Sequence, residues 1–165
     1  IIRNSTRCLN LIQHFLALHK YTSIKNAVGL TPLHLAAMCG SQVFYNQQLL
    51  QTEFLALTSD STTPLMLLAL LGKDSQIKFL LKQVLDYKKL QATFFTSQQQ
   101  LKKFQSLKVL VADIQKAINM VDQHGQTAAD LAAGTVRNPF IDVSEQQKKN
   151  CVLLLQEIQD LVSDI

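Results

Sequence analysis

Residues 29–40 read GLTPLHLAAMCG, and this stretch decides the fold. The hydroxyl of Thr31 can cap a helix, and Pro32 suits the first helical position because its missing N–H costs no hydrogen bond there. Gly40 can supply the left-handed residue that commonly ends a helix. The stretch therefore predicts a short helix that begins at about Pro32 and is rich in small residues, which let a second helix approach closely.

The same pattern returns twice at a regular distance. A Thr-Pro pair recurs 32 residues later at Thr63, and Thr127 opens a weaker copy a further 64 residues on. A fixed period of this length indicates a repeat protein built from stacked helical units. In the second copy Met66 replaces the motif His and Ser61 replaces the turn Gly, so we expect a less regular turn there. In the first copy an extra residue before Leu49 predicts a distortion of the second helix or of its turn.

The T-P-L-H-x-A core from Thr31 to Ala36 resembles the ankyrin repeat, and the D-x-x-G-x-T pattern of residues 122–127 resembles its turn. The resemblance implies an all-α fold, an ankyrin-repeat solenoid with short hairpin loops. It also implies that His34 hydrogen-bonds the backbone of neighbouring turns and is not a ligand or a base. In this family the hairpin fingers and the concave face of the inner helices bind other proteins.

The remaining residues complete a single domain over residues 1–165. Residues 101–118 trace a long apolar helical stripe, and with an outer helix from Gln76 to about Leu90 they predict one enlarged helical hairpin insert. We expect Phe94 and Phe95 to pack into this hairpin near its tip. The expected units are an N-terminal capping helix (1–24), two repeats (25–57 and 58–85), a divergent helical unit (86–118), and a terminal repeat with a C-terminal capping helix (119–165).

The resemblance also places a row of partner-binding positions along the fingers and the inner helices. Some of these residues are more apolar than a solvated surface requires, which favours either a hydrophobic partner site or burial against a further domain. Both alternatives stay open at this point. The row comprises Ala27, Val28, Leu30, Met38, Cys39, Ser59, Asp60, Thr62, Leu70, Leu71, Gln123, His124 and Gln126.

Basic residues are concentrated in the middle of the chain. Residues 73–116 contain nine lysines and three aspartates, a local charge of +6 that exceeds the formal charge of +4 of the whole chain. Such a face can meet an acidic protein, nucleic acid or an anionic membrane surface, or it can simply be solvated. Nucleic acid is not expected, because no aromatic-rich nucleic-acid motif accompanies the lysines. The predicted basic face consists of Lys88, Lys89, Lys102, Lys103 and Lys108.

The composition argues against several classes of function. No apolar run approaches the roughly 18 residues that span a bilayer, and the first residues lack the pattern of a signal peptide. Three cysteines at unrelated spacings fit a reducing compartment, so we expect a cytoplasmic location. The sequence contains no Gly-rich phosphate loop, Cys/His metal set or nucleophile elbow. We therefore expect no enzyme activity, catalytic residue, cofactor or metal site.

Two further hypotheses concern the wider context. The chain begins with Ile1 and not with Met, which indicates a processed product or part of a longer protein. An alternative function is therefore the targeting or substrate-recruiting domain of a larger enzyme. The Gln-rich, divergent repeats also resemble ankyrin proteins that intracellular bacteria deliver into host cells, which implies a host protein as partner and the host cytoplasm as location. In each case we expect a monomer that binds another protein.

Overall fold

The computed structural model describes residues 25–134 and 144–165, and these residues form helices and turns with no strand among them. The expected N-terminal capping helix (1–24) lies outside the described residues. None of the described helices is both long and apolar enough to cross a membrane. The helical elements are α2 (Pro32–Cys39), the 3-10 helix η1 (Gln42–Tyr45), α3 (Gln47–Glu53), α4 (Pro64–Leu70), α5 (Asp74–Gln91), α6 (Gln98–Asn119), α7 (Ala128–Ala133) and α8 (Glu145–Ser163).

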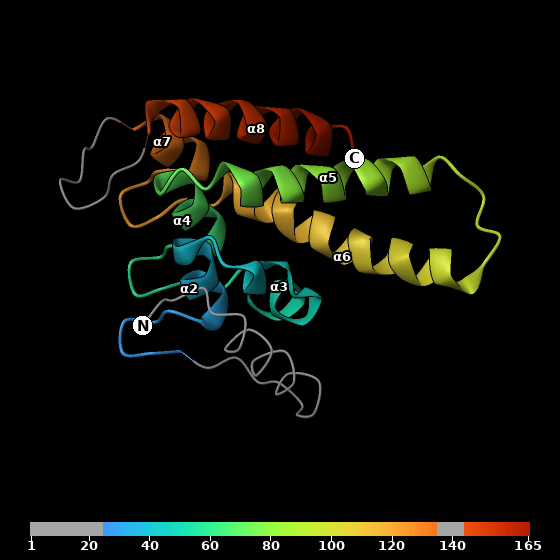
Figure 1. Cartoon of the computed structure of the whole chain (residues 1–165), viewed down its shortest axis with the longest axis horizontal. Helices are drawn as coiled ribbons and strands as arrows, with labels where there is room; N and C mark the ends of the chain where they lie inside the picture. Colours follow the sequence, from blue (N-terminus) through green and yellow to red (C-terminus); the bar gives the residue numbers. More distant parts are fainter. Residues whose placement is uncertain (1–24, 135–143) are drawn as a thin grey trace.

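The three short helices α2, α4 and α7 form the inner layer, in which α2 packs on α4 and α4 packs on α7 (Figure 1). Each begins directly after a threonine whose hydroxyl accepts a hydrogen bond from the third helical N–H, as the sequence predicts. Gly40 adopts the left-handed conformation after α2, with φ 63°. The all-α repeat architecture expected from the Thr-Pro pattern is therefore confirmed.

The turns before the three inner helices have the same backbone structure. In each turn a backbone N–H to C=O bond joins the first residue to the fifth, and the N–H of the fourth residue donates to the carbonyl oxygen of the first. A side-chain oxygen of the first residue accepts two further N–H groups. The closing bonds measure 3.0 Å (Asn26 to Leu30), 3.1 Å (Thr58 to Thr62) and 3.0 Å (Asp122 to Gln126). We call these turns the fingers, at residues 26–30, 58–62 and 122–126.

The expectation of a less regular second turn is wrong. Ser61 takes the position of the turn glycine with φ 60°, a left-handed conformation that a residue with a Cβ adopts at some cost. The hydroxyl of Thr58 offsets that cost, because it accepts hydrogen bonds from the N–H groups of Asp60 (3.3 Å) and Thr62 (3.2 Å). Asn26 and Asp122 do the same in the other fingers with amide or carboxylate oxygens.

The outer helix of the first repeat is broken, as the extra residue before Leu49 predicts. The 3-10 helix η1 ends at Tyr45, and α3 starts afresh with Asn46 as its cap, whose side-chain oxygen accepts from the N–H of Leu49 at 3.1 Å. Both pieces still bury apolar side chains against the inner layer. Phe44 and Leu49 are fully buried.

The outer layer is dominated by three long helices. Helix α5 continues past the predicted unit boundary at residue 86 and pairs with α6 in an antiparallel hairpin (Figure 1). Helix α8 packs against α5 and α7 and so covers the end of the stack of repeats that α7 forms. The third finger nevertheless stacks directly on the second, since the N–H of Gln123 donates to the carbonyl oxygen of Asp60 at 3.3 Å. Helix α5 begins as the outer helix of the second repeat, and its extension together with α6 leaves the stack of repeats and returns to it.

The two phenylalanines at the hairpin tip behave differently from one another. Phe95 packs only in part as predicted, because 38% of it stays exposed while its ring lies 4.9 Å from that of Phe104, which stacks on Tyr87 at 5.2 Å. Phe94 does not, and its side chain is 97% exposed. The ring contact of Phe95 with Phe104 therefore does not extend to its neighbour Phe94.

Exchanging the residues at two equivalent turn positions tests this account of the fingers. The substitution Ser61→Gly removes a Cβ from a left-handed residue and should raise the free energy of unfolding by up to about 1 kcal/mol. The reverse change Gly29→Ser should lower it by roughly 1–2 kcal/mol, because φ is +81° and a Cβ would lie 3.0 Å from the backbone nitrogen of Ser59.

Urea unfolding followed by far-ultraviolet circular dichroism measures both effects. Each variant is the control for the other, since the same two residue types are exchanged in equivalent turns. A loss of stability in Ser61→Gly would instead mean that the serine side chain itself supports the second finger.

Candidate partner-binding surfaces

The three fingers are joined into one row by hydrogen bonds between them. The carbonyl oxygen of Val28 accepts from the backbone N–H of Ser59 at 3.2 Å and from its hydroxyl at 3.1 Å. The bond from Gln123 to Asp60 joins the second finger to the third. All three project from the same side of the inner layer (Figure 1). A ligand that contacts several fingers therefore meets a surface whose backbone is already fixed.

The structure places the predicted partner-binding residues at two levels, in the fingers and at the C-terminal ends of the inner helices α2 and α4. The side chains at the finger tips are exposed, and Val28 is the most apolar of them at 54% exposure. The residues that close the turns are half-buried, as are the inner-helix residues, which stand at the ends of α2 and α4 that are farther from the fingers. Exposed members are Ala27, Val28, Ser59, Asp60, Gln123 and His124, and half-buried members are Leu30, Met38, Cys39, Thr62, Leu70, Leu71 and Gln126.

His34 ties the inner layer to the next finger, as the resemblance implies. Its Nδ1 accepts from the N–H of Thr31 at 3.1 Å, which leaves Nε2 protonated to donate to the carbonyl oxygen of Thr62 at 3.0 Å. The ring is fully buried, and burial lowers the pKa of His34 below its ordinary value of 6.5. The neutral imidazole is thus a structural link between the first and second repeats.

A buried carboxylate that the sequence patterns did not reveal lies behind the first repeat. Glu53, at the end of α3, is fully buried, and its Oε2 accepts from the N–H of Leu33 at 2.9 Å. The first N–H groups of a helix lack partners within the helix, so this carboxylate stabilises the start of α2. Nothing in the repeat pattern links residues 33 and 53, because the contact depends on where α3 packs.

The predicted basic face lies on the α5–α6 hairpin, at the opposite end of the molecule from the fingers (Figure 1). Lys89, Lys102, Lys103 and Lys108 are exposed. Lys88 is half-buried and its Nζ lies 3.9 Å from a carboxylate oxygen of Asp164, just beyond the end of α8. The structure therefore separates the two groups of predicted residues into two surfaces.

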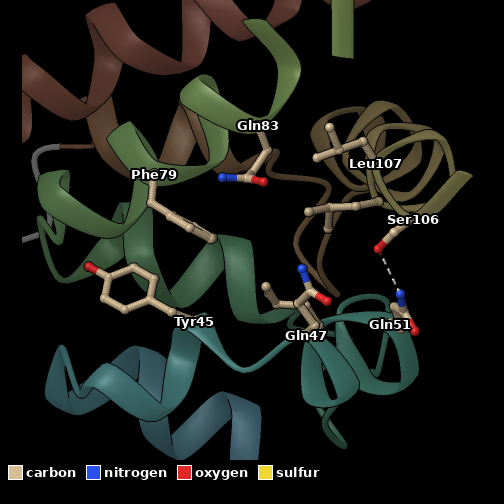
Figure 2. Close-up of a pocket in the computed structure, with 9 residues that line it drawn as sticks. Tyr45, Gln47, Gln51, Phe79, Gln83, Ser106 and Leu107 are labelled. Carbon is tan, nitrogen blue, oxygen red and sulfur yellow. Dashed lines mark hydrogen bonds between the residues drawn. The ribbon is translucent and has the colours of Figure 1, made fainter. Parts of the chain in front are cut away.

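Sequence reasoning also missed a small pocket between α3, α5 and α6 (Figure 2). Its volume is about 190 Å³, and a hydrogen bond of 3.1 Å from Gln51 Nε2 to Ser106 Oγ joins α3 to α6 at its rim. The polar groups that line it are amides, a hydroxyl and a phenol, which bind neutral polar groups but carry no charge. The lining residues are Tyr45, Gln47, Leu50, Gln51, Phe79, Gln83, Ser106, Leu107 and Leu110.

The two cysteines in the described part of the chain are held as thiols. The thiol of Cys39 donates to the carbonyl oxygen of Leu35 at 2.8 Å, and burial raises its pKa. Burial, and to a smaller extent the nearby charge of Asp74, raises the pKa of Cys151 to about 12. A thiol in this state is a poor nucleophile. Within residues 25–134 and 144–165, no cluster of three or more histidine, cysteine or acidic side chains is placed to hold a metal ion.

Comparison with known proteins identifies the repeat. A family model for ankyrin repeats, in three copies, matches residues 2–91, which is more than half of the chain. The match ends with α5, whereas the hydrogen bonds of the third finger and the cap of α7 continue the same local structure beyond it. No curated protein and no solved structure matches the chain.

The buried imidazole predicts a pH dependence of stability. Because the pKa of His34 is lowered on folding, the unfolded chain takes up a proton that the folded chain excludes as the pH falls below about 6.5. Stability should therefore decrease from pH 7 towards pH 5. The substitution His34→Met copies the residue at the equivalent position of the second repeat, and it should flatten this dependence while costing roughly 1–2 kcal/mol at pH 7 through the lost hydrogen bonds.

Urea midpoints of both proteins between pH 5 and 8 measure the difference in slope. Other groups titrate equally in the two proteins, so the difference isolates His34. Parallel curves would show that the ring is not excluded from protonation by folding.

Proposed function

The chain belongs to the ankyrin-repeat family, and we propose that it binds a partner protein along the finger row and the adjoining face of the inner helices. Ankyrin repeats are general protein–protein interaction modules and are typically non-catalytic. The observation that carries the proposal for this chain is the hydrogen-bonded row of fingers. It holds exposed side chains from three repeats in fixed order, so little conformational entropy is lost on binding.

The chemistry of the row specifies what a partner must offer. The first finger presents the apolar side chain of Val28, the second presents the carboxylate of Asp60, and the third presents polar groups of Gln123 and His124. A complementary surface would place an apolar group, a cation or hydrogen-bond donor, and further polar groups in that order. Partly exposed leucines and methionine of the fingers and the inner helices would give such an interface its apolar centre.

The two hypotheses about the wider context, a recruiting domain of a larger enzyme and a bacterial effector, both place partner binding on this same surface. A recruiting domain of a larger enzyme would bind a substrate protein there, and a bacterial effector would bind a host protein there. Both therefore concern the identity of the partner and leave the binding mode unchanged. Burial of the row against a further domain of the same protein is the alternative that a binding experiment must exclude.

A matched pair of substitutions tests the finger row. Val28 on the first finger is 54% exposed and Val109 on the solvent face of α6 is 51% exposed, so the same change at each alters the fold to a similar, small extent. We expect Val28→Glu to weaken partner binding by at least about tenfold, through loss of an apolar contact and burial of a charge. We expect Val109→Glu to bind as the unchanged protein does.

Affinity capture from a eukaryotic cytosolic lysate, with quantitative mass spectrometry, compares the three proteins. A partner of the row is a protein lost with Val28→Glu and kept with Val109→Glu. A photo-crosslinking residue placed at position 28 should join the same protein to the chain. Equal capture by Val28→Glu and the unchanged protein would remove the finger row from the interface.

A further inference from the structure

The end of the α5–α6 hairpin has an unusual composition. Residues 88–103 read KKLQATFFTSQQQLKK, in which a pair of lysines stands at each end and two phenylalanines stand near the middle. This segment, which we call the hairpin tip, contains four lysines and no acidic residue. Residues 91–103 are all exposed. The tip thus carries a charge of +4 at the most distant end of a protruding hairpin (Figure 1).

The tip holds Phe94 outward on an ordered loop. Phe95 packs on Phe104, which fixes one side of the loop against α6. The side-chain oxygen of Gln100 accepts from the N–H of Thr96 at 3.1 Å, and the hydroxyl of Ser97 caps α6. Phe94 receives no such cover and is 97% exposed. An aromatic side chain presented in this way to water is costly unless another surface receives it.

The charges around Phe94 are almost entirely positive. Lys89, Lys102 and Lys103 are exposed. Lys88 is offset by Asp164, whose carboxylate oxygen lies 3.9 Å from its ammonium nitrogen. The nearest acids along the hairpin itself are Asp86 and Asp113, which lie outside the tip on the sides toward the repeats.

We propose that the hairpin tip docks on a membrane surface that contains anionic lipid. Phe94 enters the interfacial region between headgroups and acyl chains, where aromatic side chains are favoured. The lysines have long apolar stems, so their ammonium groups remain among the lipid phosphates while the ring lies deeper. Leu101, which is 42% exposed in the first turn of α6, adds a second apolar contact.

Charge and shape together favour a membrane over the other polyanions. Single-stranded nucleic acid is bound by grooves in which several aromatic rings stack on successive bases, whereas the tip is a protruding end on which Phe94 alone is almost fully exposed and the ring of Phe95 packs on Phe104. The hairpin extends beyond the end of α8, so the tip reaches a flat surface before the rest of the molecule does (Figure 1). The fingers lie at the other end and stay free to bind a protein. The inference does not depend on the function proposed for the fingers.

The chain contains no tryptophan, which gives a direct test of the position of residue 94. In the full chain carrying Phe94→Trp, emission should shift to the blue on addition of phosphatidylcholine vesicles containing about 30% phosphatidylserine, and not with phosphatidylcholine alone. Leu153→Trp is the control, because Leu153 on α8 is 69% exposed but distant from the tip. Its emission should stay unchanged with both vesicles.

Vesicle sedimentation tests the two components of binding separately. Phe94→Ser should weaken binding to the anionic vesicles by about tenfold or more. The double substitution Lys102→Gln/Lys103→Gln should weaken it by roughly 25-fold, at about fivefold for each lysine near the surface. Lys78→Gln/Lys82→Gln removes the same charge from exposed positions of α5 nearer the repeats and should change affinity by no more than about twofold. All these side chains are exposed, so the thermal unfolding of the variants should match that of the unchanged chain.

Three results would overturn the inference. The first is an absence of vesicle binding by the unchanged chain at low salt. The second is binding without a blue shift of the Phe94→Trp variant. The third is equal affinity for anionic vesicles and for a single-stranded oligonucleotide, with no effect of Phe94→Ser on either, which would identify a general attraction to polyanions.

Discussion

The inner helices α2, α4 and α7 each depend on one side-chain oxygen that accepts two backbone N–H groups in the turn before the helix. The oxygen belongs to an amide at Asn26, a hydroxyl at Thr58 and a carboxylate at Asp122. Three chemically different groups accept the same pair of hydrogen bonds, because the turn requires only a hydrogen-bond acceptor on a short side chain at that position. With the turn closed, the following threonine reaches the helix N-terminus, and the inner helices start at equivalent places in the stack.

Stacking of equivalent turns also explains why the chain tolerates a large insert. The second and third fingers are separated by about twice the distance in sequence that separates the first and second, yet the bond from Gln123 to Asp60 joins them directly. Extra residues must therefore leave the stack, and they do so on the outer side as the extension of α5 and as α6. The end of that hairpin has few neighbours to bury its side chains, so its composition is free to serve contacts outside the molecule.

The sequence predicted the elements whose causes are local. The Thr-Pro starts, the break before Leu49 and the long hairpin helices all follow from capping groups and apolar spacing within a few residues. The regular second turn could have been predicted from Thr58, because its hydroxyl is a good hydrogen-bond acceptor three residues before Ser61. The absence of a glycine at position 61 pointed instead to an irregular turn. The contact of Glu53 with Leu33, the pocket of Figure 2 and the exposure of Phe94 could not be predicted, because each depends on how helices from different units pack.

The finger row and the hairpin tip differ in what holds their side chains in place. In the fingers the backbone is fixed by bonds between repeats, so the surface depends on the stack as a whole. At the tip, the contact of Phe95 with Phe104 and the stacking of Phe104 on Tyr87 hold the loop using only the two helices that carry it. A substitution in the repeats that disturbs the finger row therefore does not have to alter the structure of the hairpin tip. Because the two surfaces have separate supports and lie at opposite ends, occupation of one does not obstruct the other.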